Sequence, residues 1–319
     1  MLTPRRLMLL EVAREVAEKD AYAANAIGFM PRIFAKANLP YTNPDKNPNT
    51  KSKWERSNGK YNLEICSGTV LSRNGEMKRL GIPYGVIPRL IISWLATEVV
   101  RNKSPKIRFR KKLVDFMTEL EMGSTGGNNG SITRFKEQLV RLFSSTITVK
   151  IDNDNIWNNY TFKIADELFA NHFKKSNVNE KCNINIDCTL SLDDWLFTEL
   201  KDHSFPVDMR VVHALRKSTL SLDIYTWLTS RVYKMSGMSN IPWKYLKKQF
   251  GSQHGRTSDF VSNFKKCLEE VQLFYPDIKV EATRKELKLR PSPSHVSAKK
   301  AVNKQSSQKC PAHDAQITH

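Results

Sequence analysis

The chain has 319 residues, a length that suggests two domains and is ample for a hydrophobic core. Hydrophobic residues make up 40% of the sequence, and the formal net charge is +19 at pH 7. A charge of this size attracts polyanions, so it favours nucleic acid as a partner over a merely basic solvated surface.

The sequence contains no pattern typical of a metal site, a disulfide framework or an active site. Its five cysteines are an odd number at irregular spacing, without a C-x-x-C pair. Its seven histidines include no H-x-H and no H-E-x-x-H. The glycine loop at 123–130 lacks the Lys-Ser or Lys-Thr pair of a nucleotide-binding P-loop. Because no nucleophile elbow or kinase motif is present either, we expect no catalytic residues, no metal and no cofactor.

Two apolar stretches need to be distinguished from membrane segments. The longest, residues 82–100, contains Pro88, Arg89 and Glu98, so we expect a buried helix. The N-terminal stretch has acidic residues soon after its apolar patch and no small-residue cleavage site, which is unlike a signal peptide. These features predict a cytoplasmic protein with no membrane partner.

Residues 1–78 are predicted to form an extension that contains one helix and one β-hairpin. The helix covers residues 3–24, and it either packs on the domain behind it or binds a protein partner. Strand-like runs follow at 60–65 and 68–72, and Asn58-Gly59 is a hairpin-type turn signal before the first of them.

A first domain is predicted at 79–178. Its long apolar helix at 83–100 is followed by a basic run, RNKSPKIRFRKK, and by a second helix at 112–122. The stretch TGGNNGSITRFKEQLVRLFSSTITVKI then reads as a glycine loop, an amphipathic helix capped by Ser131, and a strand. A further strand at 157–165 completes three helices and a hairpin, which is the order of a winged helix.

A second domain is predicted at 183–293, after a polar linker at 171–185. Its expected helices cover 191–200, 206–217, 220–235, 242–250 and 256–274, and its expected hairpin has strands at 278–283 and 286–290. Gly251 is expected to end the fourth of these helices. The order of elements repeats that of the first domain.

The predicted fold is therefore α+β, with two tandem winged-helix domains after a short N-terminal helix and strand extension. Composition turns polar and basic from Pro291 on, without a period. We predict a disordered basic tail, which we bound at 294–319.

The candidate DNA-binding residues lie on the exposed faces of the two predicted recognition helices, in the basic run and at the second hairpin tip. Arginine can contact guanine with two hydrogen bonds, and hydroxyl side chains can contact bases or phosphates. An ordinary solvated helix face is the alternative, and we rank DNA contact ahead of it for Arg134 and Lys265. The complete set is Ser131, Thr133, Arg134, Glu137, Arg141, Arg108, Arg110, Lys111, Arg256, Thr257, Ser258, Lys265, Lys266, Arg284 and Lys285.

Several segments in order resemble the plasmid-encoded RepA replication initiators of Gram-negative bacteria. They are GIPYGVIPRLIISWLATEVVRNKS, TGGNNGSITRFKEQLVRLFSSTI, LSLDIYTWLTSRVYKM, IPWKYLKKQFG and RPSPSHV. The matching positions include Gly126, Gly127, Gly130, Ser131, Ile132, Thr133 and Arg134 in the first unit. In the second unit they include Leu222, Asp223, Ile224, Tyr225, Trp227, Pro242, Trp243, Phe250 and Gly251. The resemblance runs from about Phe29 to Val296.

The resemblance implies a non-enzymatic initiator that binds repeated sites, called iterons, in double-stranded plasmid origin DNA. It also implies opening of nearby AT-rich DNA, recruitment of the host replication initiator and helicase, a monomer–dimer equilibrium and repression of the protein's own gene. Two alternatives stay open. One is a winged-helix transcriptional repressor without a replication role. The other is a DNA-nicking or priming enzyme, which the missing histidine pair disfavours.

Overall fold

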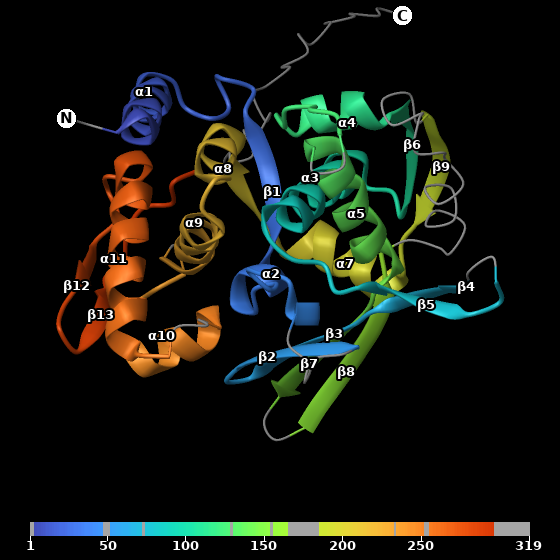
Figure 1. Ribbon diagram of the computed structural model, residues 1–319. Helices are drawn as coiled ribbons and strands as arrows, with labels where there is room; N and C mark the ends of the chain where they lie inside the picture. The colour runs from blue at the N-terminus through green and yellow to red at the C-terminus, as the bar shows by residue number, and fades with distance from the viewer. Residues whose placement is uncertain are drawn as a thin grey trace, which may run out of the picture.

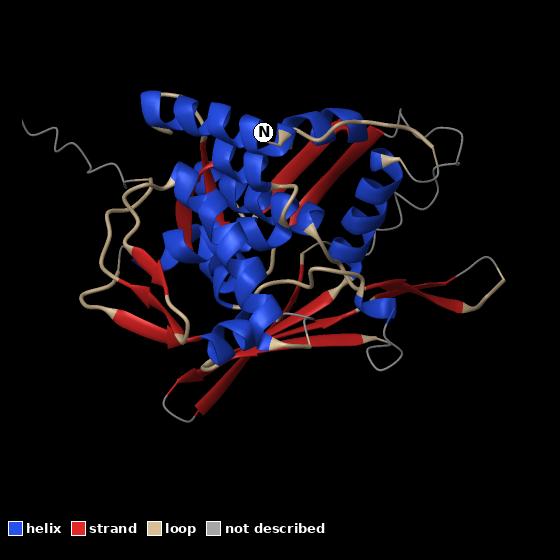
Figure 2. Ribbon diagram, turned by 60° about the vertical axis from the view of Figure 1, so that its left-hand side comes forward, coloured by secondary structure: helices blue, strands red, loops and turns tan. Residues whose placement is uncertain are grey.

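The computed structural model describes residues 3–46, 52–71, 74–127, 130–153, 156–164, 185–232, 234–251 and 255–296. The protein is a mixed α+β structure in which helices fill the centre and several small antiparallel sheets lie around them (Figures 1 and 2). Among the described residues, no helix is long and apolar enough to cross a membrane. The same residues contain no group of three or more His, Cys, Asp or Glu side chains that could hold a metal ion.

The N-terminal helix α1 (Pro4–Glu18) packs on the second half of the chain. It begins after Thr3, whose hydroxyl accepts a hydrogen bond from the backbone N–H of Arg6 at 3.3 Å. It contacts α8 (Met209–Leu215) and α11 (Thr257–Phe274), and Arg5 forms two 2.8 Å hydrogen bonds with Glu270 on α11. The helix is shorter than predicted, and its packing gives it a structural role.

Two short elements after α1 were not predicted. They are the strand β1 (Ile27–Pro31) and the helix α2 (Arg32–Lys36). β1 pairs antiparallel with β10 (Ser204–Asp208), so the predicted helix at 206–217 was wrong for its first three residues. Those residues are held extended by the ladder to β1, and α8 begins only at Met209.

A four-stranded antiparallel sheet joins the N-terminal extension to the first predicted domain. Its order is β2 (Lys53–Asn58), β3 (Tyr61–Cys66), β7 (Thr146–Asn153) and β8 (Ile156–Lys163). The Asn58-Gly59 turn is confirmed, with a positive φ of 57° at Gly59. β2 was missed, because it is a half-exposed strand with few apolar residues. A second hairpin, β4 (Gly68–Leu71) and β5 (Met77–Gly81), projects beside this sheet (Figure 1).

Aromatic side chains form the core of the first predicted domain. Trp94 on α3 (Val86–Asn102), Phe109 on β6 (Lys106–Lys112) and Phe116 on α4 (Leu113–Glu119) meet edge to face, with ring centroids 4.7 to 5.4 Å apart. Phe135 on α5 (Ser131–Ser144) extends the cluster. This geometry is favourable for aromatic quadrupoles, so the cluster fixes how the three helices pack.

The basic run at 101–112 is a strand for most of its length. β6 pairs antiparallel with β9 (Asn185–Ser191), which lies beyond the predicted domain boundary, so the predicted helix at 191–200 begins later. The predicted linker at 171–185 lies outside the described residues except for Asn185. The strand pairs β6–β9 and β1–β10 both cross the predicted domain boundaries. The domain ranges themselves stay a prediction.

The second predicted domain follows the predicted order closely. After α7 (Asp194–His203) and α8 come α9 (Thr219–Val232), β11 (Ser239–Pro242), α10 (Trp243–Phe250), α11, β12 (Val280–Ala282) and β13 (Glu286–Leu289). The three strands form an antiparallel sheet in the order β11-β13-β12. Gly251 ends α10 as predicted, in a left-handed conformation with φ 57°, and its N–H donates to the carbonyls of Lys247 and Lys248.

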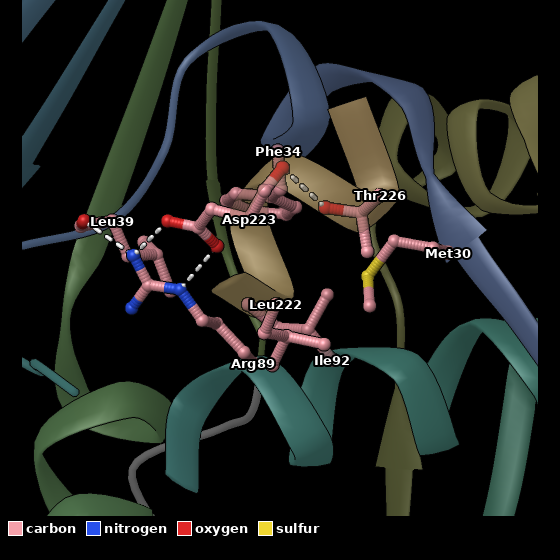
Figure 3. A pocket seen from close by; sticks show the side chains of 8 residues that line it. All are labelled: Met30, Phe34, Leu39, Arg89, Ile92, Leu222, Asp223 and Thr226. Carbon is pink, nitrogen blue, oxygen red and sulfur yellow. Dashed lines mark hydrogen bonds and ion pairs between the residues drawn. The ribbon is translucent and has the colours of Figure 1, made fainter. Parts of the chain in front are cut away.

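A buried ion pair joins the two central helices, α3 and α9. The guanidinium of Arg89 donates to both carboxylate oxygens of Asp223, at 2.7 and 2.8 Å, and both side chains are only 6% exposed (Figure 3). It also donates to the carbonyls of Leu39, Pro40 and Gly85. The charge is thus fully hydrogen-bonded, which is what burial of an arginine requires.

The predicted disordered tail begins too early. His295 and Val296 lie within the described structure, and Val296 is 5% exposed. The Tyr275 hydroxyl donates to the carbonyl of Pro293, and the His295 Nδ1 lies 3.0 Å from the Tyr225 hydroxyl. These contacts pin residues 293–296 onto α9 and the end of α11, and the rest of the predicted tail lies outside the described residues.

Replacing Arg89 with Ala leaves the Asp223 carboxylate buried without its cation. We expect the free energy of unfolding to fall by about 3–5 kcal/mol, measured by denaturant unfolding. Arg14→Ala, which breaks an exposed pair with Glu18, is the matched control and should cost less than about 1 kcal/mol. Equal stabilities for the two variants would contradict the role given to Arg89.

The pinned segment should loosen in acid. Burial lowers the pKa of the His295 imidazole below its ordinary value of 6.5. Because the unfolded chain then binds a proton more readily than the folded one, the stability from neutral His295 is full above about pH 6.5 and declines below it. We expect the wild type to lose more unfolding free energy than His295→Gln between pH 7.5 and pH 5.5. Parallel losses would count against this effect.

Candidate nucleic-acid interface

In the second half of the chain, α10 holds the start of α11 and the turn between β12 and β13. The Lys247 ammonium donates to the carbonyl of Gly255 at 2.9 Å, just before α11. The Trp243 indole donates to the carbonyl of Thr283 at 3.2 Å, at the turn. The Thr283 hydroxyl closes that turn by accepting from the N–H of Glu286 at 3.1 Å. One short helix therefore positions two candidate DNA-binding regions.

Most of the predicted site residues in these two regions are exposed. Exposed side chains are Arg256, Thr257, Ser258, Lys266, Arg284 and Lys285, and Lys265 is half-buried. α11 is fixed from its other side by Phe260 and Phe264, which are fully buried. Within the described part of the chain, no ion pair engages Arg256, Lys266 or Arg284, so these charges are available to a polyanion.

The glycine loop of the first half folds back onto the start of α5. The N-cap of α5 is Gly130, so the prediction that Ser131 caps the helix was wrong. The Ser131 hydroxyl instead donates to the carbonyl of Gly123 at 2.5 Å and accepts from the N–H of Thr125 at 2.8 Å. The Thr133 hydroxyl donates to the carbonyl of Gly127 at 2.8 Å. Both predicted contact residues therefore shape the loop.

Gly130 makes this fold-back possible. A Cβ atom at this position would lie 2.3 Å from the carbonyl oxygen of Gly126 and 2.4 Å from that of Thr125. Both atoms belong to the backbone, so the loop could not move aside without losing its hydrogen bonds.

Arg141 is mostly buried, with a side chain 11% exposed. Its guanidinium donates to Asp45 at 2.7 Å, to Glu137 at 2.7 Å and to the carbonyl of Ile82 at 3.1 Å. It also lies over the Tyr84 ring, 5.3 Å from the centroid. Arg141 thus ties α5 to the chain before α3, and Glu137 on the same helix holds its guanidinium. Arg134, in contrast, is exposed and makes no ion pair in the described part of the chain.

The basic run displays cations along one face of β6. Arg108 and Arg110 are exposed, and Arg110 lies 3.6 Å from Asp187 on β9. Lys111 points to the opposite side, where it pairs with Glu119 and lies 5.7 Å from the Trp94 ring centroid. Lys111 therefore covers the aromatic core.

Two exposed cations on β6 were missed by sequence reasoning. Lys106 and Lys112 share the outward face with Arg108 and Arg110, because side chains alternate along a strand. Recognition of the alternation Ile107–Phe109 inward against charge outward would have found them. What the local sequence does not give is the pairing, because the partner strand β9 lies about 80 residues further along the chain in an antiparallel register set by the fold.

The chain combines a mixed α+β fold with exposed cations on α11, along β6 and at a hairpin turn, and with the exposed Arg134 on α5, an arrangement suited to a nucleic-acid-binding protein. A family described as plasmid-encoded RepA protein matches residues 82–244. The chain belongs to this family and is a plasmid replication protein. No curated protein and no solved structure matches the chain.

Replacing Ser131 with Ala removes the donor and the acceptor that close the glycine loop. We expect the free energy of unfolding to fall by about 1–2 kcal/mol and the Thr125 amide to exchange hydrogen faster. Ser124→Ala is the control, because Ser124 is exposed on the same loop. A Thr125 amide that stays as protected as in the control would show that Ser131 does not hold the loop.

Proposed function

We propose that the protein initiates plasmid replication by binding repeated sites in double-stranded origin DNA through two winged helices. The order and pairing of elements in the second half support this. Its elements follow one another in the order α9, β11, α10, α11 and the β12–β13 hairpin. The three strands form one sheet in the order β11-β13-β12. In such a unit the last helix enters the major groove and the hairpin contacts the backbone or minor groove.

The first half is proposed to be a second winged helix with modified sheet pairing. Its elements α3, β6, α4, α5, β7 and β8 have the same order. Here β6 pairs with β9 and β7 pairs with β3, so neighbouring parts of the chain complete the sheets. Under this proposal α5 is the first recognition helix, and Arg134 is its base-contacting candidate.

Charge supports the choice of DNA as the partner. The chain carries 51 Lys and Arg residues against 32 Asp and Glu residues. Exposed cations lie at the start and in the middle of α11, at the β12–β13 turn and along β6. Contacts of this kind with phosphates place and orient a protein on DNA, whereas arginines in the groove supply sequence preference.

We further propose that the protein acts by binding rather than by catalysis, in the cytoplasm. We also propose that it opens the origin, recruits the host initiator and helicase, exchanges between monomer and dimer, and represses its own gene. These proposals rest on the membership of the plasmid RepA family. Repression alone, without initiation, would leave plasmid maintenance independent of the gene.

The first test is binding to the plasmid's own origin. A fragment that carries the repeats should bind far more tightly than a shuffled fragment of equal length, with an affinity that falls linearly on a logarithmic salt scale. Equal affinity for the two fragments would sink sequence-specific binding. Survival of the plasmid after an in-frame deletion of the gene would sink initiation and leave only repression.

Arg134→Ala should weaken binding to the repeat fragment by about 1–3 kcal/mol and relax base preference at one position, if the guanidinium contacts guanine. Lys266→Ala should weaken binding to all sequences and reduce the salt slope by about 1. Arg14→Ala, an exposed arginine on α1, controls for the loss of one charge. Unchanged affinity of Arg134→Ala would remove α5 from the interface.

A further inference from the structure

A basic groove lies apart from the candidate DNA-binding residues. It has a volume of about 500 Å³, and its walls come from α2, the β2–β3 hairpin, the end of α9 and α10. Five cations line it: Arg32, Lys36, Lys60, Arg231 and Lys234. None of the candidate DNA-binding residues lines it, so it is a separate feature of the surface.

None of the described residues that line the groove is acidic. Glu199 on α7 interacts with Arg32 and Lys36 but does not line the hollow, and burial raises the pKa of its carboxyl. Like charges that converge from separate elements repel one another and destabilise the folded chain. An anion bound in the groove would offset this repulsion.

The walls of the groove are already held in place by the protein. The Asn58 side chain donates to the carbonyl of Lys36 at 2.7 Å, and the Lys36 ammonium donates to the Tyr61 hydroxyl. The Arg231 guanidinium reaches the Ser239 hydroxyl at 3.2 Å and lies over the Trp227 ring. The first two contacts fix α2 against the hairpin, and the others hold Arg231 at the end of α9. Helices α2 and α9 also contact each other, so the site is preformed without any ligand.

Gln249 is a second, independent sign of a ligand. It is only 7% exposed and lines the groove from α10. Its amide makes no hydrogen bond with any residue in the described part of the chain. The side chain is largely enclosed by the protein but lines the groove, so its amide can bond with a molecule bound there.

We propose that this groove binds a small organic polyphosphate, such as a nucleoside triphosphate, with the cations on its phosphates and Gln249 on a polar edge. The volume lies within the range of small-molecule sites, roughly 300–1,000 Å³. Guanidinium groups bond phosphate oxygens in pairs, and ammonium groups add point charge. The groove holds the ligand without hydrolysing it. The bound ligand ties α2 and the hairpin to α9 and α10.

Phosphates could also come from a nucleic-acid strand, and a titration separates the two sources. Tripolyphosphate, ATP, AMP and a 12-nucleotide single strand are each titrated into the full-length protein in Mg²⁺-free buffer. Binding is read by calorimetry and by the rise in melting temperature. We expect ATP and tripolyphosphate to bind at least tenfold more tightly than AMP. Binding of the single strand alone, or of none of the four, would overturn the proposal.

Variants decide whether the binding occurs in the groove. The double variant Arg32→Ala and Arg231→Ala should weaken ATP binding at least tenfold, while Lys217→Ala, which removes an exposed charge at the far end of α9, should not. Gln249→Leu changes no charge, and it should weaken ATP binding at least threefold. ATP binding at the wild-type level in both groove variants would overturn the proposal. This outcome is independent of origin binding, because the candidate DNA-binding residues are intact in every variant.

Discussion

The buried bond between Arg89 and Asp223 is the interaction on which the rest of the structure depends. It joins the central helix of each half of the chain, and the same guanidinium holds the carbonyls of Leu39 and Pro40. Arg56 adds a nearby link, because it donates to the carbonyl of Phe250 at the end of α10. The two guanidiniums lie 5.3 and 5.6 Å from the ring centroid of Tyr41. Burial and the Asp223 charge raise the pKa of the Tyr41 phenol, so it stays neutral between them.

Because of this bond, the two halves are not independent units on a linker. The N-terminal extension pairs β1 with β10 and β3 with β7, so it contacts both halves. α1 adds a third connection through the pair between Arg5 and Glu270. These contacts together therefore fix the separation between α5 and α11. Under the proposed function, this rigid arrangement would let the protein recognise the spacing of two DNA sites as well as their sequence, since it avoids the entropy of ordering a flexible link.

Local signals predicted the second half well and the first half less well. α11 was predicted almost to the residue, because Phe260, Phe264 and Leu268 recur at helical spacing. Strands β1 and β9 were missed because their pairing partners lie far along the chain. Strand β2 pairs with its neighbour β3, and it was missed because it is half-exposed and has few apolar residues. The site shows the same division. Exposure of Arg134 follows from helical periodicity, whereas the inward turn of Arg141 follows from Asp45, which is 96 residues away. Serine is a residue type that commonly caps helices, but the Ser131 hydroxyl bonds with the backbone of the glycine loop instead.

The most direct test of two-helix DNA recognition is a hydroxyl-radical footprint on the plasmid's own origin. Each bound chain should protect two stretches about one helical turn, roughly 10 base pairs, apart on one face of the duplex. Arg134→Ala should lose protection in one stretch, and Lys266→Ala in the other. A single protected stretch, weakened equally by both variants, would contradict the account, because α5 and α11 would then not read separate sites.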